Sequence, residues 1–235
     1  EMCIRDSDGP TYNFGWERIY AGTGDDTIEV SGDNTAGLFI YGEDGDDVID
    51  ISAGKLRSYD GMDFQVRGGS GDDRLIGNDD NNFFEGGSGE DSIYGGNGNN
   101  TLKGDEGNDS IESGSGNDTL FGGNNDDILK AGGGNDVIYG GGNSAKGNDD
   151  SIDIAVFSGN SSDYRVARAT DVTFGYVYYI QDTRDGSPDG LDTLYEIDKL
   201  RFSDGDFNLA VYYSNQAEGS AGDDELTGTP GDDLI

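Results

Sequence analysis

Residues 68–139 read GGSGDDRLI, GNDDNNFFE, GGSGEDSIY, GGNGNNTLK, GDEGNDSIE, SGSGNDTLF, GGNNDDILK and AGGGNDVIY, which are eight nine-residue copies without a gap. The eighth position is apolar in every copy: Leu75, Phe84, Ile93, Leu102, Ile111, Leu120, Leu129 and Ile138. The sixth position is always Asp or Asn: Asp73, Asn82, Asp91, Asn100, Asp109, Asp118, Asp127 and Asp136. A flexible acidic linker gives no reason for the apolar eighth position. The pattern indicates a solenoid of stacked repeats that binds calcium.

Each copy is predicted to be a six-residue turn followed by a three-residue strand. Neighbouring side chains of a strand point to opposite faces, so position eight faces inward and positions seven and nine face outward. Arg74, Glu85 and Lys103 at the outer positions agree with this. Glycine fills the turn because the backbone there needs positive φ and close approach of successive turns. Two copies complete one coil, which predicts two parallel sheets joined by two columns of turns.

The composition excludes several classes of protein. The chain has 235 residues with 14 basic and 49 acidic side chains, a net charge of −35 and 32% hydrophobic residues. A chain this acidic is a poor partner for nucleic acid or an anionic membrane surface. No apolar run approaches the length of a membrane-spanning helix. It has no histidine, no phosphate loop and no nucleophile or zinc-protease motif, so no catalytic site is predicted and the segment is interpreted as a non-enzyme.

The chain divides into five segments by composition. They are a non-native or disordered leader (1–10), degenerate repeat turns (11–67), the regular repeats (68–150), a small β-rich module (151–215) and the start of a further, truncated repeat block (216–235). The first residues, EMCIRDS, match nothing downstream and resemble a translated adapter sequence. We therefore expect a fragment of a longer protein.

The 151–215 module is predicted to hold short strands near 156–157, 164–166, 172–180 and 199–202, with a weak helical turn near 191–197. Asp182, Asp185, Asp189 and Asp192 are predicted to form an acidic surface turn, since the Asp-x-Asp-x-Asp-Gly spacing of a calcium loop is missing. The run 176–179, YVYY, is predicted to be a strand with one ring face buried. A sugar-binding strip is the alternative for these tyrosines.

The motif Gly-Gly-x-Gly-x-Asp-x-apolar-x, tight over 68–139 and loose over 21–50, resembles the RTX (repeats-in-toxin) family of haemolysin-type calcium-binding repeats. The resemblance implies a right-handed parallel β-roll with calcium between successive coils. It also implies that the 151–215 module caps the roll or spaces repeat blocks. The implied ligands are carboxylates of Asp73, Asp91, Asp109, Asp118, Asp127 and Asp136, with Asp26 and Asp47 as weaker candidates, and carbonyls of Gly69, Gly71, Gly87, Gly89, Gly96, Gly98, Gly107, Gly114, Gly116, Gly132 and Gly134.

Some copies depart from this motif. Alternate copies share a column, so the first column is all carboxylate, whereas the second begins with Asn82 and Asn100. We expect the gap between these two asparagines to bind calcium weakly or not at all. Asp80 and Asn125 also replace turn glycines, the latter at the last site of the first column.

The resemblance implies a calcium-dependent folding and secretion module. It would leave a bacterium unfolded through type I secretion machinery and fold in extracellular calcium. One alternative is an adhesin or surface-layer module that binds polysaccharide or a cell surface. Another is the non-catalytic C-terminal part of an RTX exoenzyme such as a metalloprotease, lipase or epimerase.

Overall fold

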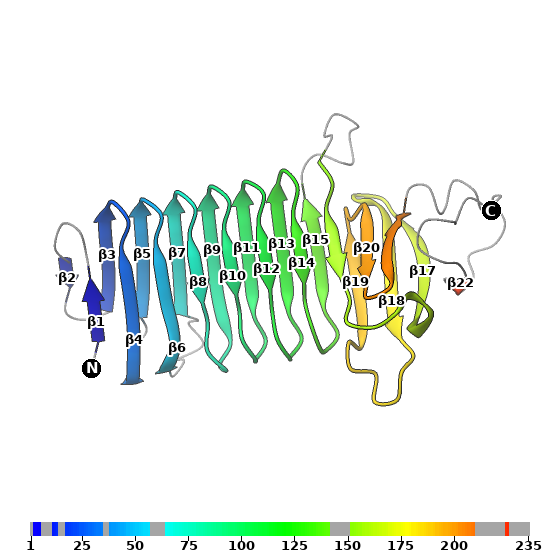
Figure 1. Cartoon of the computed structure of the whole chain (residues 1–235), viewed down its shortest axis with the longest axis horizontal. Helices are drawn as coiled ribbons and strands as arrows, with labels where there is room; N and C mark the ends of the chain where they lie inside the picture. The colour runs from blue at the N-terminus through cyan, green and yellow to red at the C-terminus, as the bar shows by residue number, and fades with distance from the viewer. Residues whose placement is uncertain are drawn as a thin grey trace.

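The computed structural model describes residues 2–5, 11–13, 17–34, 38–56, 64–141, 151–209 and 224–225. Within these residues the chain is built almost wholly of strands, and successive strands along the repeats alternate between two sheets (Figure 1). The truncated block expected at 216–235 lies outside the described residues except for 224–225, and residues 142–150 and 210–215 of the neighbouring segments also lie outside them.

One sheet has ten described strands. In spatial order they are β1 (Met2–Arg5), β4 (Thr27–Asn34), β6 (Val48–Leu56), β8 (Arg74–Ile76), β10 (Ser92–Tyr94), β12 (Ser110–Glu112), β14 (Ile128–Lys130), β16 (Ile154–Val156), β20 (Lys199–Phe202) and β21 (Gly205–Asn208).

The other sheet has twelve described strands. In spatial order they are β2 (Thr11–Asn13), β3 (Glu17–Thr23), β5 (Leu38–Asp44), β7 (Phe64–Ser70), β9 (Asn82–Ser88), β11 (Thr101–Glu106), β13 (Thr119–Asn124), β15 (Val137–Gly141), β19 (Leu191–Tyr195), β18 (Gly175–Asp182), β17 (Tyr164–Asp171) and β22 (Asp224–Glu225).

The repeat strands pair in parallel with a register of two repeats. Ile93 lies between Leu75 and Ile111 in one sheet. In the other sheet, Leu102 lies between Phe84 and Leu120. Each pair of nonapeptides therefore forms one coil, and the predicted all-β parallel β-roll is confirmed.

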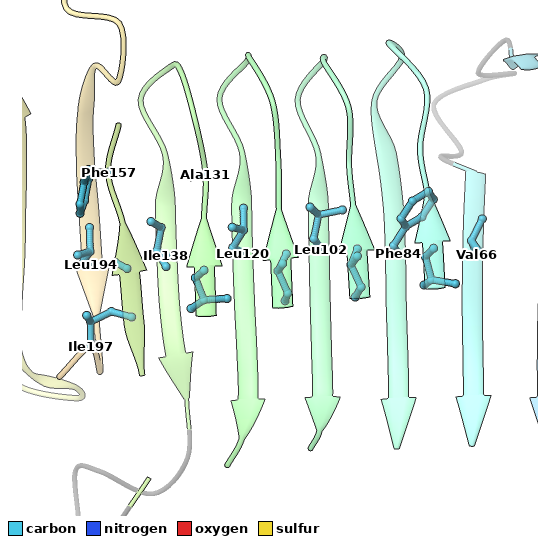
Figure 2. Packing of buried hydrophobic residues seen from close by; sticks show 14 of the residues in the cluster. Val66, Phe84, Leu102, Leu120, Ala131, Ile138, Phe157, Leu194 and Ile197 are labelled. Atoms are coloured by element: carbon cyan, nitrogen blue, oxygen red, sulfur yellow. The ribbon is translucent and has the colours of Figure 1, made fainter. Parts of the chain in front are cut away.

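The core is a row of position-eight side chains enclosed between the two sheets. All eight of them, from Leu75 to Ile138, are at most 1% exposed. Figure 2 shows Val66, Phe84, Leu102, Leu120, Ile138 and Leu194 one behind another along the stack. The three-residue strands have only one inward position each. The six- or seven-residue strands of the other sheet have further buried positions, but these hold glycine or asparagine, so each repeat still buries one apolar side chain from its strand.

Positions seven and nine face outward, as predicted. In β8, β12 and β14, for example, the central residue is buried and its neighbours are exposed or half-buried. Outward charged side chains form ion pairs between coils. The carboxylate of Glu85 pairs with the guanidinium group of Arg67 at 2.6 Å and with the ammonium group of Lys103 at 3.0 Å. Such exposed pairs contribute little individually, but they relieve part of the like-charge repulsion on a very acidic surface.

Strand β1 pairs antiparallel with β4 at the start of the ten-stranded sheet. Its residues, Met2–Arg5, fall inside the segment that the sequence assigns to a non-native or disordered leader. The rest of that segment, residues 1 and 6–10, lies outside the described residues.

Residues 151–209 continue the roll. Strand β16 pairs in parallel with β14, β19 pairs with β15, and β20 pairs with β16. Between β16 and β19 the chain inserts the 3₁₀ turn η2 (Ser161–Asp163) and the antiparallel hairpin of β17 and β18. The helical turn expected near 191–197 is wrong, because Thr193, Leu194 and Tyr195 stack in strand register on Val137, Ile138 and Tyr139.

The buried row gives a test of the coil geometry. Leu120→Ala should lower the free energy of unfolding by about 2–5 kcal/mol, because Leu120 is fully buried and truncation leaves a cavity. Ile128→Ala is the matched control, since Ile128 occupies position seven and is 39% exposed. Its cost should be well under half as large in calcium-saturated thermal denaturation. Equal costs would contradict the assignment of inward and outward positions.

Candidate metal centre

The position-six residues form a continuous hydrogen-bond ladder along each column of turns. The backbone N–H of Asp73 donates to Oδ1 of Asp91 at 2.8 Å, and that of Asp91 donates to Oδ1 of Asp109 at 2.8 Å. The ladder of the first column runs through Asp26, Asp47, Asp73, Asp91, Asp109, Asp127 and Asp153, and that of the second through Asn82, Asn100, Asp118, Asp136 and Asp192.

The ladders extend beyond the residues that the resemblance implied as calcium ligands. Asp153 accepts from the N–H of Asp127 at 3.0 Å, and Asp192 accepts from that of Asp136 at 2.9 Å. The insertions before these two residues break the nine-residue period, so a search by spacing misses them. A signal remained in the sequence, since Gly190, Asp192 and Leu194 keep the Gly-x-Asp-x-apolar core. Asp26 and Asp47, the weaker candidates, belong to the same ladder as the regular repeats.

Position five carries a second ladder that the sequence analysis missed. Oδ1 of Asp72 accepts the backbone N–H of Glu90 at 2.8 Å, and Oδ1 of Asn99 accepts that of Asn117 at 2.7 Å. This ladder points toward the following coil, whereas the position-six side chains accept from the preceding coil. Each turn is thus tied to both neighbours. Asn and Asp are frequent in any Gly-rich turn, so composition alone does not reveal this role.

The turn backbone explains the glycines at positions two and four. Gly87 and Gly89 have φ of 129° and 132°. The carbonyl groups of Gly69 and Gly71 lie where a Cβ on these two residues would stand, so a larger residue would clash. Asn125 adopts φ of 78° in place of a glycine. Because Asn tolerates this region, the turn of the seventh repeat is kept.

The predicted carbonyl ligands all lie in these stacked turns. Gly69, Gly71, Gly87, Gly89 and Gly107 belong to the first column, and Gly96, Gly98, Gly114, Gly116, Gly132 and Gly134 belong to the second.

The two asparagines of the second column show where these carbonyls point. Nδ2 of Asn82 donates to the carbonyls of Asn78 (3.1 Å) and Asp80 (2.7 Å) in its own turn. It also donates to the carbonyl of Gly95 in the next coil at 2.9 Å. The carbonyls of positions two and four therefore converge on the tip of the position-six side chain.

Asn100 repeats this arrangement. Its Nδ2 donates to the carbonyls of Gly96 at 3.2 Å and Gly98 at 3.3 Å, and to Oγ of Ser113 at 3.1 Å. In these two copies the side-chain amide donates hydrogen bonds to the carbonyl oxygens that converge on it. This geometry supports the prediction that the gap between Asn82 and Asn100 takes up little or no calcium.

At most position-six aspartates, the second carboxylate oxygen has no donor. It is buried and without a hydrogen-bond partner in seven copies: Asp47, Asp73, Asp91, Asp109, Asp118, Asp127 and Asp136. In the first column this oxygen lies over the position-one glycine: Oδ2 of Asp73 and the carbonyl of Gly86 both approach the place of a Cβ on Gly68. Two acceptor oxygens thus come together at a buried position, which is unfavourable without a proton or a cation.

Burial raises the pKa of these carboxyl groups, and at Asp47, Asp73, Asp91, Asp127 and Asp136 the charge of a ladder neighbour adds to the effect. The pKa is raised to about 6 at Asp47, about 7 at Asp73 and Asp91, and about 8 at Asp127. The hydrogen bond from the preceding coil opposes the shift at each of them. At Asp127 the main neighbouring charge is that of Asp153. Each buried negative charge thus lacks compensation.

This donor set fits a hard divalent cation. Calcium takes several oxygen ligands, including carboxylates and backbone carbonyls, in flexible geometry. Among the described residues no three carboxylate or thiol side chains converge on one point. A cation in these turns would be held by the position-six carboxylate together with carbonyls of positions two and four and of the next coil's position one.

The family comparison agrees with the geometry. A family model for the RTX calcium-binding nonapeptide repeat matches residues 12–34, 39–54, 67–102, 94–129, 121–144 and 211–235, more than half of the chain. The chain belongs to the RTX calcium-binding repeat family. A comparison with curated proteins gives no match. RTX repeats bind calcium and are generally non-catalytic. In the described part of the chain, no helix is long and apolar enough to cross a membrane.

The acidic residues of the insertion differ from expectation. Asp182, Asp189 and Asp192 are at most 5% exposed, so the predicted surface turn is wrong for all three and holds only for Asp185. Asp182 pairs with Arg184 at 2.8 Å, and Asp189 accepts a very short hydrogen bond from the hydroxyl of Tyr164. These partners offset the cost of burying the two carboxylates.

The raised pKa values predict that, without metal, the roll is more stable at acidic pH than at neutral pH. The carboxyl groups have higher pKa in the folded chain than the unfolded value of about 3.9, so folding takes up protons. In EDTA, folded content should therefore be greatest near or below pH 4 and fall as pH rises through about 6 to 8. Far-ultraviolet circular dichroism against pH measures this. More strand signal at pH 8 than at pH 4 in EDTA would contradict it.

The amide contacts of Asn82 and Asn100 lead to a prediction for Asp91→Asn. In this variant the side-chain NH2 group should donate to the carbonyls that would otherwise bind calcium. The variant should bind less calcium by titration, while its metal-free stability rises by about 1–3 kcal/mol, because the new amide satisfies orphaned oxygens. Asp91→Ala is the control, since it removes the Oδ1 acceptor of the Asp73 N–H and should destabilise the roll with or without calcium. Identical behaviour of the two variants in EDTA would refute the amide mechanism.

Proposed function

We propose that this chain is a calcium-dependent folding and secretion module of a larger secreted bacterial protein. The observation that carries the proposal is the buried carboxylate oxygen of position six, which faces carbonyl oxygens and has no donor. Bound calcium would supply the positive charge that this position lacks.

The first column is proposed as the principal calcium column. From Asp47 to Asp127 each of its position-six residues is a buried carboxylate, and position one is glycine throughout (Gly42, Gly68, Gly86, Gly104 and Gly122). In the second column, Asp118 and Asp136 are the described residues that have a buried carboxylate oxygen without a hydrogen-bond partner in turns whose glycine carbonyls are predicted calcium ligands. The Asn82 and Asn100 turns would hold together through their own amides.

The coupling between calcium and folding follows from mass action. A site with calcium at about 100 times its dissociation constant stabilises the folded state by about 2.7 kcal/mol, so a few sites decide a marginal equilibrium. Without calcium, a net charge of −35 and the stacked carboxylates oppose compaction. The chain would stay unfolded in the cytosol, pass the type I secretion machinery and fold outside the cell.

The C-terminal strands are proposed to close the roll. Phe157, Tyr164 and Phe202 form a buried aromatic cluster, with ring centroids 5.0–5.4 Å apart, at the end of the position-eight row. Large rings fill a space that no further coil of described repeats would fill, which suits the predicted capping role.

Calcium titration tests the folding function. Strand signal in circular dichroism should be weak in EDTA at pH 7.5 and should rise cooperatively between micromolar and 10 mM calcium, the range that includes extracellular calcium modules. Magnesium at equal concentration is the control, because it demands stricter octahedral geometry. A compact, strand-rich chain in EDTA at neutral pH would falsify the proposal.

A further inference from the structure

The hairpin of β17 and β18 continues the twelve-stranded sheet at the C-terminal end of the stack (Figure 1), and its turn lies over β19 and β15. Phe174, in the turn between the two strands, leans on the roll. Its ring centroid lies 5.7 Å from that of Tyr139 and 5.0 Å from that of Tyr195, both tilted. A groove lies between the hairpin turn and the preceding coils.

This groove has a volume of about 520 Å³, within the range of small-molecule sites. Its aromatic side is formed by Phe121, Tyr139 and Phe174, and its polar side chains are Asp105, Asn124 and Glu196. Backbone of Gly123, Gly140 and Gly141 completes the lining. No lining residue is basic, so the groove does not suit an anionic ligand.

Both acidic residues have a backbone conformation that favours glycine. Asp105 has φ of 79° and Glu196 has φ of 54°, and they are two of the five non-glycine residues with positive φ in the described chain. Asp105 stands at position two of its turn, where the neighbouring coils have Gly87 and Gly123. Backbone strain of this kind concentrates at functional sites, where the side chain compensates for its cost.

Tyr139 offers the groove no free ring face. Tyr139 is stacked between Phe121 and Tyr195, with centroids 4.8 and 4.7 Å away and planes within 10°. Both faces of Tyr139 are therefore covered, and its edge and the Phe174 ring remain for C–H contacts. Two carboxylates and a carboxamide supply acceptors for hydroxyl groups.

We propose that this groove binds a neutral sugar unit of an oligosaccharide. The hydroxyl groups donate to Asp105, Glu196 and Asn124, and the C–H face of the sugar packs on Phe174 and the edge of Tyr139. The site differs from the tyrosine strip considered from sequence: Tyr176 and Tyr179 do not line the groove, and the Tyr176 ring faces Arg168 at 4.5 Å.

The carboxylates of Asp105 and Glu196 both line the groove. Neither carboxylate has an ion-pair partner within 4.0 Å among the described residues. Both carboxylates are therefore available as acceptors for hydroxyl groups.

The experiment measures binding of the calcium-folded chain to a panel of neutral oligosaccharides (glucans, mannans, galactans and N-acetylglucosamine oligomers), followed by calorimetry on the best binder. Phe174→Ala, Asp105→Gly and Glu196→Gly should each weaken binding at least tenfold. The two glycine variants should also raise the melting temperature, because glycine relieves the positive-φ strain.

Glu43→Gly is the matched control for Asp105→Gly. Glu43 occupies the same turn position at the same φ of 79°, but it lies outside the groove. It should gain stability and leave binding unchanged, and Tyr176→Ala should also leave binding unchanged. No binding across the panel, binding insensitive to the three groove variants, or saturable binding of choline in place of sugar would each overturn the proposal. All measurements use folded protein, so they are independent of whether calcium drives folding.

Discussion

The roll depends on buried oxygen atoms that face one another along the columns of turns. The position-six carboxylate uses one oxygen to accept the N–H of the preceding coil, which leaves its second oxygen against converging carbonyls. Without a proton or a cation this contact is repulsive, so the hydrogen-bond ladder and the calcium requirement come from the same side chain. Where asparagine replaces aspartate, one nitrogen removes the repulsion and the requirement together.

Much of the fold could be predicted from the repeat. An apolar residue every nine positions fixes the inward face, and the two-repeat coil follows because a three-residue strand and a six-residue turn reverse the chain once per copy. The pairing of Leu102 with Phe84 and Leu120 agrees with that reasoning. The two columns, and the difference between their position-six residues, were also accessible from spacing alone.

Other features were hidden for physical reasons. The position-five ladder uses Asn and Asp, which any turn favours, so it carries no compositional contrast. Asp192 lies 56 residues after its partner Asp136, and no periodicity survives an insertion of that length. The buried Asp189 looked solvent-exposed because its partner Tyr164 lies 25 residues away in the sequence and meets it only in the tertiary fold. The partner of Asp182, Arg184, is local, but the sequence does not show that their pair is buried. The groove beneath Phe174 likewise arises from contacts between distant segments.

The insertion between β16 and β19 has a wider consequence. Both sheets resume beyond it in register with the coils before it: Leu194 stacks on Ile138 in one sheet, and Leu200 stacks on Ala155 in the other. A solenoid of this design can therefore accept a long excursion within one turn as long as the chain returns one strand spacing further on. New surfaces can be grafted onto the outside of such a scaffold while its ion-binding interior is retained, so recognition and folding can diversify separately.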